Sequence, residues 1–145
     1  MTERLPLPTR RAAVATLVAT HGTSPKDPGA KMWVGEDGSI LGSVTIGGCV
    51  DARVIEESAR VLATGTPQLL AMSLGDEDAW TLGMTCGGTV EILVEPVDPA
   101  RPDEPVAAAL QLAERTAAAG RRAVIVAPLG SSRERSRQVH WRRRA

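Results

Sequence analysis

Two cysteines beside paired glycines are the residues in this sequence that point most directly to chemistry. Cys49 ends the stretch GGC, and Cys86 begins the stretch CGG. Glycine lets a ligand approach the backbone closely because it has no side chain. The amides at a helix N-terminus favour anions and can lower the pKa of a thiol. If the two loops lie together, they form a pocket that presents two sulfur atoms and several anion-binding amides.

Each of these features also has a purely structural interpretation. A single cysteine at a helix start is often only a small buried residue, and glycine pairs often only turn the chain. The two cysteines lie 37 positions apart and, together with His21 and His140, match no short metal-ligand spacing, so we expect no metal site. The sequence also has no phosphate-binding loop, dinucleotide fingerprint or serine-hydrolase motif.

The composition is typical of one globular domain, with an unusual core. The 145 residues include no Phe, no Tyr and three Trp, so the core must consist of Val, Ile, Leu, Ala and Met. No stretch approaches the roughly 18 apolar residues of a membrane helix. Glu3 and the absence of a small-residue cleavage site argue against a signal peptide. We therefore expect a cytoplasmic protein with reduced thiols and no membrane partner.

The formal net charge of zero hides a marked asymmetry along the chain. Residues 1–130 contain 11 basic and 16 acidic side chains, whereas residues 131–145 contain six Arg and one Glu. An acidic body argues against a nucleic-acid-binding domain. The basic end has no hydrophobic periodicity. We expect one domain over 1–130, followed by a flexible, disordered tail over 131–145.

The elements that must position the two cysteines follow from hydrophobic patterns and turn residues. Asp37-Gly38 predicts a tight hairpin turn, and Gly65 and Gly120 predict helix ends. Residues 75–80 (GDEDAW) predict an acidic turn or a short helix. Strands are predicted over 12–20, 30–35, 39–46, 68–73, 88–95 and 122–129, and helices over 50–64 and 105–119. This pattern predicts an α/β or α+β layered domain, with a mixed β-sheet and a few packing helices.

Three motifs in order resemble one known family. They are PKDPGAKM at 25–32, GGCVD at 47–51 and TCGGTVE at 85–91. In this order they closely resemble the N-terminal domain of the XdhC/CoxI family, over about residues 11–97. Members of that family are accessory proteins of xanthine dehydrogenase and carbon monoxide dehydrogenase.

The resemblance implies a molybdenum-cofactor chaperone, an accessory factor rather than an enzyme. Such a protein binds the finished cofactor, holds it while a cysteine desulfurase sulfurates it, and delivers it to the apo form of a molybdenum hydroxylase. By motif position Cys86 contacts the cofactor, the glycines beside both cysteines admit it, and Lys31 pairs with its phosphate. The implied cofactor-binding residues are Pro25, Gly29, Lys31, Gly47, Gly48, Cys49, Cys86, Gly87 and Gly88.

Two differences from the family pattern leave alternatives open. The family usually has Glu where this chain has Asp51. Many members continue into a C-terminal Rossmann-type domain that this sequence does not include, which implies a separate Rossmann-type partner or an inactive truncated product. Two other functions remain: a sulfurtransferase-like protein that carries persulfide on a cysteine, and a docking module that binds no cofactor. Few aromatic residues and an incomplete second half are expected to leave apolar surface exposed, so we expect a homo-oligomer such as a homodimer, or a complex with a different partner protein.

Overall fold

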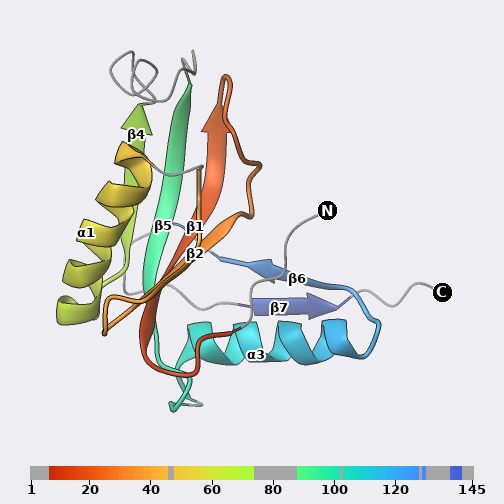
Figure 1. Ribbon diagram of the computed structural model, residues 1–145. Helices are drawn as coiled ribbons and strands as arrows, with labels where there is room; N and C mark the ends of the chain where they lie inside the picture. The colour runs from red at the N-terminus through yellow and green to blue at the C-terminus, as the bar shows by residue number, and fades with distance from the viewer. Residues whose placement is uncertain are drawn as a thin grey trace.

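The central element of the computed structural model is a five-stranded sheet in the order β3-β2-β1-β5-β4 (Figure 1). The structure describes residues 7–45, 48–73, 88–101, 103–127 and 129, and the backbone of 138–141. The strands of this sheet are β1 (Ala12–His21), β2 (Lys31–Gly35), β3 (Ile40–Gly42), β4 (Gln68–Ser73) and β5 (Thr89–Val97). The other elements are the helices α1 (Cys49–Thr64) and α3 (Pro105–Ala118) and the strands β6 (Ala123–Val126) and β7 (Gln138–Trp141).

The predicted layered domain is confirmed, and the strand directions refine the expected mixed sheet. Every strand pairing among the described residues is antiparallel. The predicted hairpin at Asp37-Gly38 is present, because β2 pairs with β3 and the Gly35 amide donates to the Ser39 carbonyl at 2.8 Å. An antiparallel sheet with helices packed on its faces corresponds to the α+β arrangement, one of the two that were expected.

One face of the sheet is covered by α1. Val50, Val54 and Val61 of this helix are buried against the alternating apolar residues of β1 and β5. The 3.6-residue period of the helix and the 2-residue period of the strands bring these side chains to one interface. Gly65 ends α1 in the left-handed conformation, with φ of 70°, and its amide donates to the Val61 carbonyl at 2.8 Å. This helix end was predicted from the glycine.

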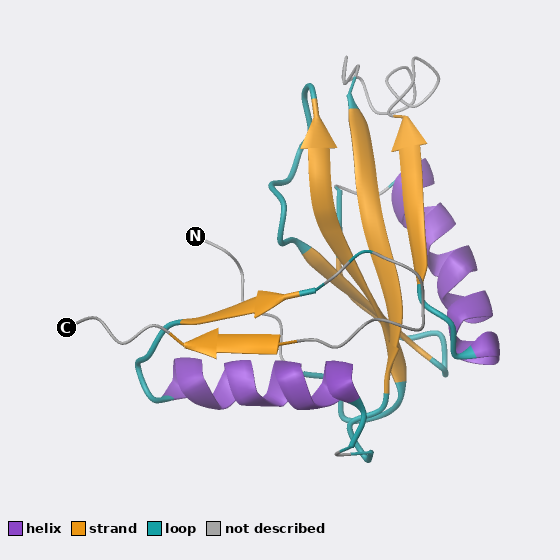
Figure 2. Ribbon diagram, turned by 180° about the vertical axis from the view of Figure 1, so that it is seen from behind, coloured by secondary structure: helices purple, strands orange, loops and turns teal. Residues whose placement is uncertain are grey.

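The opposite face of the sheet packs against α3. Val14 and Trp33 form a second core cluster with Ala107 and Leu110 of this helix. Glu104 caps the helix, because its carboxylate accepts from the amides of Val106 at 3.2 Å and Ala107 at 3.0 Å. Figure 2 shows α3 and the β6–β7 hairpin beside one end of the sheet.

The structure differs from the sequence predictions at three places. The strand expected over 39–46 ends at Gly42, because the following segment turns toward α1. The strand expected over 122–129 is shorter, since β6 ends at Val126. Residues 138–141 of the expected flexible tail form β7, whose backbone pairs with β6. The acidic turn or short helix expected over 75–80 lies outside the described residues.

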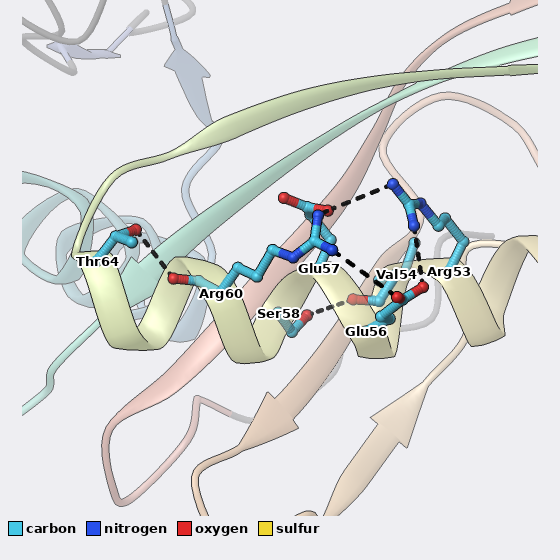
Figure 3. A network of polar contacts seen from close by, with 7 residues as sticks. All are labelled: Arg53, Val54, Glu56, Glu57, Ser58, Arg60 and Thr64. Atoms are coloured by element: carbon cyan, nitrogen blue, oxygen red, sulfur yellow. Dashed lines mark hydrogen bonds and ion pairs between the residues drawn. The ribbon is translucent and has the colours of Figure 1, made fainter.

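Four charged residues of α1, Arg53, Glu56, Glu57 and Arg60, form a network of ion pairs along the helix (Figure 3). Arg53 contacts Glu56 at 2.9 Å and Glu57 at 3.8 Å, and Arg60 contacts Glu57 at 3.3 Å and Glu56 at 4.0 Å. The Glu57 side chain is 9% exposed, whereas that of Glu56 is 58% exposed. Glu57 therefore depends on both arginines to compensate its lost hydration.

This difference in exposure predicts unequal effects of two matched substitutions. Glu57→Gln should lower the free energy of unfolding by about 1 kcal/mol, because two cations lose a shielded partner. Glu56→Gln should cost only about 0.3 kcal/mol, as is usual for exposed helix pairs. Urea unfolding at low and high salt measures both. Equal losses for the two variants would show that burial of Glu57 has no electrostatic consequence.

Candidate functional site

One end of the sheet brings together the segments that carry the sequence motifs. Strand β1 ends and β5 begins there, since His21 pairs with Thr89. Strand β4 also ends there, since Ser73 pairs with the same Thr89. Figures 1 and 2 both show the first turn of α1 at this end of the domain. The ends of β1 and β4 and the beginning of β5 therefore meet at the end of the domain where α1 begins.

Gly88 lies where the chain enters β5, in close contact with the backbone that follows β1. It is buried, and a Cβ atom at this position would lie 2.5 Å from the Thr23 carbonyl oxygen and 2.6 Å from that of His21. Such distances are far inside van der Waals contact, so only glycine fits. The sequence suggested that Gly88 admits a ligand, and the structure gives it a further role in joining two loops at this end of the sheet.

The start of α1 presents an exposed thiol and backbone amides. Gly48 precedes the helix with φ of 82° and ψ of −155°, a conformation that essentially only glycine adopts. Its carbonyl accepts from the Ala52 amide at 3.1 Å, and none of the described side chains caps the helix. Cys49, the first helical residue, is exposed. The first-turn amides and the positive end of the helix dipole favour an anion here.

A buried carboxylate fixes the segment that leads into this helix. Asp51 is 8% exposed and accepts hydrogen bonds from the Thr45 hydroxyl at 3.0 Å and the Thr45 amide at 3.2 Å. The Ser43 hydroxyl donates to the same carboxylate. These bonds hold residues 43–45 against the first turn of α1. Asp51 therefore shapes the approach to Gly48 and Cys49 without being exposed itself.

The loop that follows β1 is tied to that strand by backbone hydrogen bonds. The Gly29 amide donates to the Leu17 carbonyl at 2.7 Å, and the Leu17 amide donates to the Ala30 carbonyl at 2.9 Å. Gly29 has φ of 102°, and both Gly29 and Pro25 are exposed. The register of β1 against β5 shifts at a β-bulge just after Leu17. The backbone bonds of Leu17 to Gly29 and Ala30 lie next to this bulge.

Lys31 lies farther along the sheet than the other predicted site residues. Its Nζ donates to the Thr16 hydroxyl at 2.8 Å, and the two residues are paired across β1 and β2. Thr16 is five positions from the end of β1 at His21. The ammonium group is thus held on the sheet surface rather than at the start of α1.

The structure brings some of the predicted site residues to one end of the domain and leaves others outside its described ranges. Gly48, Cys49 and Gly88 share that end, whereas Lys31 lies along β2. Gly47, Cys86 and Gly87 lie outside the described residues. Asp51 received no role from the sequence, although an acidic residue in a helix first turn, shortly after two hydroxyl residues, is a pattern that predicts a local hydrogen-bond network.

Two general features of the described ranges bear on the kind of site. Within them, no group of three or more His, Cys, Asp or Glu side chains is arranged to hold a metal ion. Neither of the two helices described here has both the length and the apolar stretch needed to cross a bilayer.

Comparison with known proteins identifies the family. The model of the XdhC and CoxI family matches residues 8–75. The uncharacterized protein YqeB of Escherichia coli (strain K12) is 35% identical over 82 residues, which are 57% of this chain and 15% of YqeB. The molybdenum cofactor insertion chaperone PaoD of the same organism is 30% identical over 92 residues, which are 63% of this chain and 28% of PaoD.

A solved structure supports the same relationship at the level of the fold. A crystal structure of a xanthine dehydrogenase from Bacillus halodurans superimposes with a TM-score of 0.70 and 28% sequence identity, over 86% of this chain and 36% of that one. The layered sheet-and-helix domain described above is thus shared with a solved protein. The resemblance predicted from the sequence motifs is thus confirmed over residues 8–75, which match the model of the XdhC and CoxI family. The chain spans less than a third of the length of either of these two curated relatives.

The close contact at Gly88 predicts a strong effect of adding one methyl group. Gly88→Ala should lower the free energy of unfolding by about 2–3 kcal/mol, because two backbone carbonyls must move. Gly65→Ala is the matched control, because its Cβ would meet nothing within 4 Å. Its free energy of unfolding should fall by only about 1 kcal/mol, the cost of a left-handed backbone conformation for alanine. Thermal unfolding measures both. A Gly88 variant as stable as the control would contradict the packing described here.

The buried network at Asp51 predicts a second effect on stability. Asp51→Ala should cost about 2–3 kcal/mol, because three donors lose a charged acceptor. Asp98→Ala is the control: its carboxylate accepts one exposed bond, from the Ala100 amide at 3.0 Å, and its loss should cost about 0.5 kcal/mol. Urea unfolding compares the two. If the costs were alike, Asp51 would not be what holds residues 43–45.

Proposed function

We propose that this chain is an accessory protein that binds the molybdenum cofactor, protects it and assists its sulfuration and insertion into a molybdenum hydroxylase. The observation that carries the proposal is the start of α1, where Gly48 and the exposed Cys49 form a helix N-terminus that no described side chain caps. Its relative PaoD is named as a molybdenum cofactor insertion chaperone, which supports the same role here.

The described residues fit the chemistry of such a cofactor. The cofactor carries a phosphate, for which the backbone amides at Gly48 and Cys49 and the helix dipole provide a favourable environment. It also carries a soft, sulfur-bound metal, for which a cysteine thiolate is a matching ligand. When bound, the cofactor supplies the redox-active metal that the recipient hydroxylase uses. The residues of this chain hold its anionic group, orient it and limit its contact with water.

The sequence motifs assign the remaining contacts in this proposal. Cys86, with Gly87 beside it, is the residue proposed to approach the metal, and Gly47 extends the anion-binding loop. Gly88 positions that segment through its contact with the backbone of His21 and Thr23. Pro25 and Gly29 belong to the exposed loop that lines the same end. Lys31 would have to leave its bond to Thr16 to reach a phosphate, so we give it a secondary, electrostatic part.

The partners in this proposal follow from the role. They are the apo form of a molybdenum hydroxylase, a cysteine desulfurase and a separate Rossmann-type partner. We place the protein in the cytoplasm, where cofactor insertion would occur. Exposed apolar residues on β3, β4 and β6 support self-association or docking to one of these partners.

Cofactor retention tests the proposal directly. The wild type, Cys86→Ser and Cys49→Ser would be co-expressed with an intact molybdenum-cofactor pathway, purified, and analysed for molybdenum and pterin per chain. We expect near-stoichiometric loading of the wild type and a loss of about tenfold or more in Cys86→Ser, because oxygen replaces a soft ligand. Thr64→Ser, at the other end of α1, is the control and should load fully.

The other outcomes identify the alternatives. A wild type that contains no cofactor but binds the hydroxylase regardless of Cys86→Ser would be a docking module. A persulfide found by mass spectrometry on Cys49 or Cys86 after incubation with a desulfurase would indicate a sulfurtransferase-like protein. Equal cofactor loading of all the variants would show that neither thiol takes part in cofactor binding.

A further inference from the structure

A pocket lies at the other end of β1, away from the start of α1. It has a volume of about 870 Å³ and lies between the segment that leads into β1 and the β2–β3 hairpin. This volume is within the range of small-molecule sites, roughly 300–1,000 Å³. The pocket is lined by residues from both sides, among them Leu7, Arg10, Trp33, Ser39, Ile40 and Leu41. None of them belongs to the proposed cofactor site, although the exposed residues of β3 were considered above as a docking surface.

Trp33 lines this pocket and also carries a buried hydrogen-bond donor. The residue is only 5% exposed, and its indole Nε1 has no hydrogen-bond partner among the described residues. Buried polar groups in proteins are nearly always hydrogen-bonded, so such a donor needs an explanation. The Trp33 ring packs in the core cluster that contains Val14 and Leu110, yet it also lines the pocket. An acceptor that enters from the pocket would satisfy the indole N–H.

The walls of the pocket include apolar side chains that the described elements leave uncovered. Ile40 is 51% exposed and Leu41 is 44% exposed, and both belong to β3, the strand at the edge of the sheet. Leu7 packs against the cluster around Trp33. An apolar molecule placed against these residues would bury surface that water now contacts.

The acidic groups at the rim are already engaged. The Asp37 carboxylate accepts from the Ser39 hydroxyl at 2.6 Å and from the Ser39 amide at 3.0 Å. These bonds hold the pKa of Asp37 below its usual value. Glu36 is paired with Arg11 at 2.5 Å. Arg10 adds a second guanidinium to the lining, so the rim does not repel an anionic acceptor.

We infer that this pocket binds a small, largely apolar molecule that carries one oxygen acceptor, with the acceptor on Trp33 Nε1 and the apolar body against Ile40 and Leu41. The acceptor is either a neutral carbonyl or a single anionic group, and the balanced rim accommodates both. The site is independent of the cofactor site, because the two lie at opposite ends of β1.

The probe for this inference is 8-anilinonaphthalene-1-sulfonate, an aromatic molecule with one anionic acceptor group. Titration of the full chain should increase the dye fluorescence and shift one indole N–H resonance in ¹⁵N-correlated NMR spectra, namely the one that is missing in Trp33→Phe. Trp33→Phe keeps an aromatic ring but removes the donor. Its affinity for the dye should be about tenfold weaker, the effect expected of one hydrogen bond to a charged group.

Two surface variants keep the test decisive if Trp33→Phe fails to fold. Leu41→Ser should weaken dye binding severalfold, because it removes an apolar contact in the pocket. Leu69→Ser is the matched control on the opposite edge strand, where Leu69 is 40% exposed, and it should bind as the wild type does. Repeating the titration with 2-naphthamide distinguishes a neutral acceptor from an anionic one.

The inference is overturned by any of three results. These are an unshifted Trp33 indole resonance at dye saturation, unchanged affinity in a folded Trp33→Phe, and equal effects of Leu41→Ser and Leu69→Ser. None of these results bears on cofactor loading, so the two proposals fail separately.

Discussion

The pairing of β1 with β5 is the constraint on which the rest of the structure depends. These are the two longest strands, they lie at the centre of the sheet, and both of their faces are largely buried. Their register fixes the positions of β2 and β4 on either side, and with them the face that α1 covers. A slip of one residue would turn the buried alternation of Val90, Ile92 and Val94 to the other face. The bulge after Leu17 is accommodated at the end of the pair, next to the loops of the candidate site.

The candidate site depends on this pairing through backbone contacts more than through side chains. Gly88 lets the chain that enters β5 touch the backbone after β1, and Asp51 holds the segment before α1 against the helix. Both devices order loops without placing a bulky group between them. Both act next to the start of α1, where Cys49 is exposed. The pocket at the other end of β1 differs, because it is formed by a buried indole and exposed aliphatic side chains.

Much of this architecture could be predicted from the sequence, for clear physical reasons. Apolar alternation predicted the central strands, and glycines with polar turn residues predicted the hairpin and the end of α1. What could not be predicted depends on contacts distant in sequence. Strand directions follow from the global register, and β7 exists through its pairing with β6 rather than through any hydrophobic pattern of its own. The contact of Gly88 with residues 21–23 and the orphan donor of Trp33 likewise require three-dimensional neighbours.

The absence of Phe and Tyr has a consequence for how this domain tolerates sequence change. The largest fully buried side chains are Leu17, Met32, Ile92 and Leu93, and most other members of the core are Val or Ala. Each buried methylene contributes about 0.8 kcal/mol, so shortening a valine removes little, and the burial energy is spread over many positions. Evolutionary drift among small aliphatic residues can therefore proceed in small steps. Trp33 is the exception among the described core residues, because no aliphatic side chain replaces its volume.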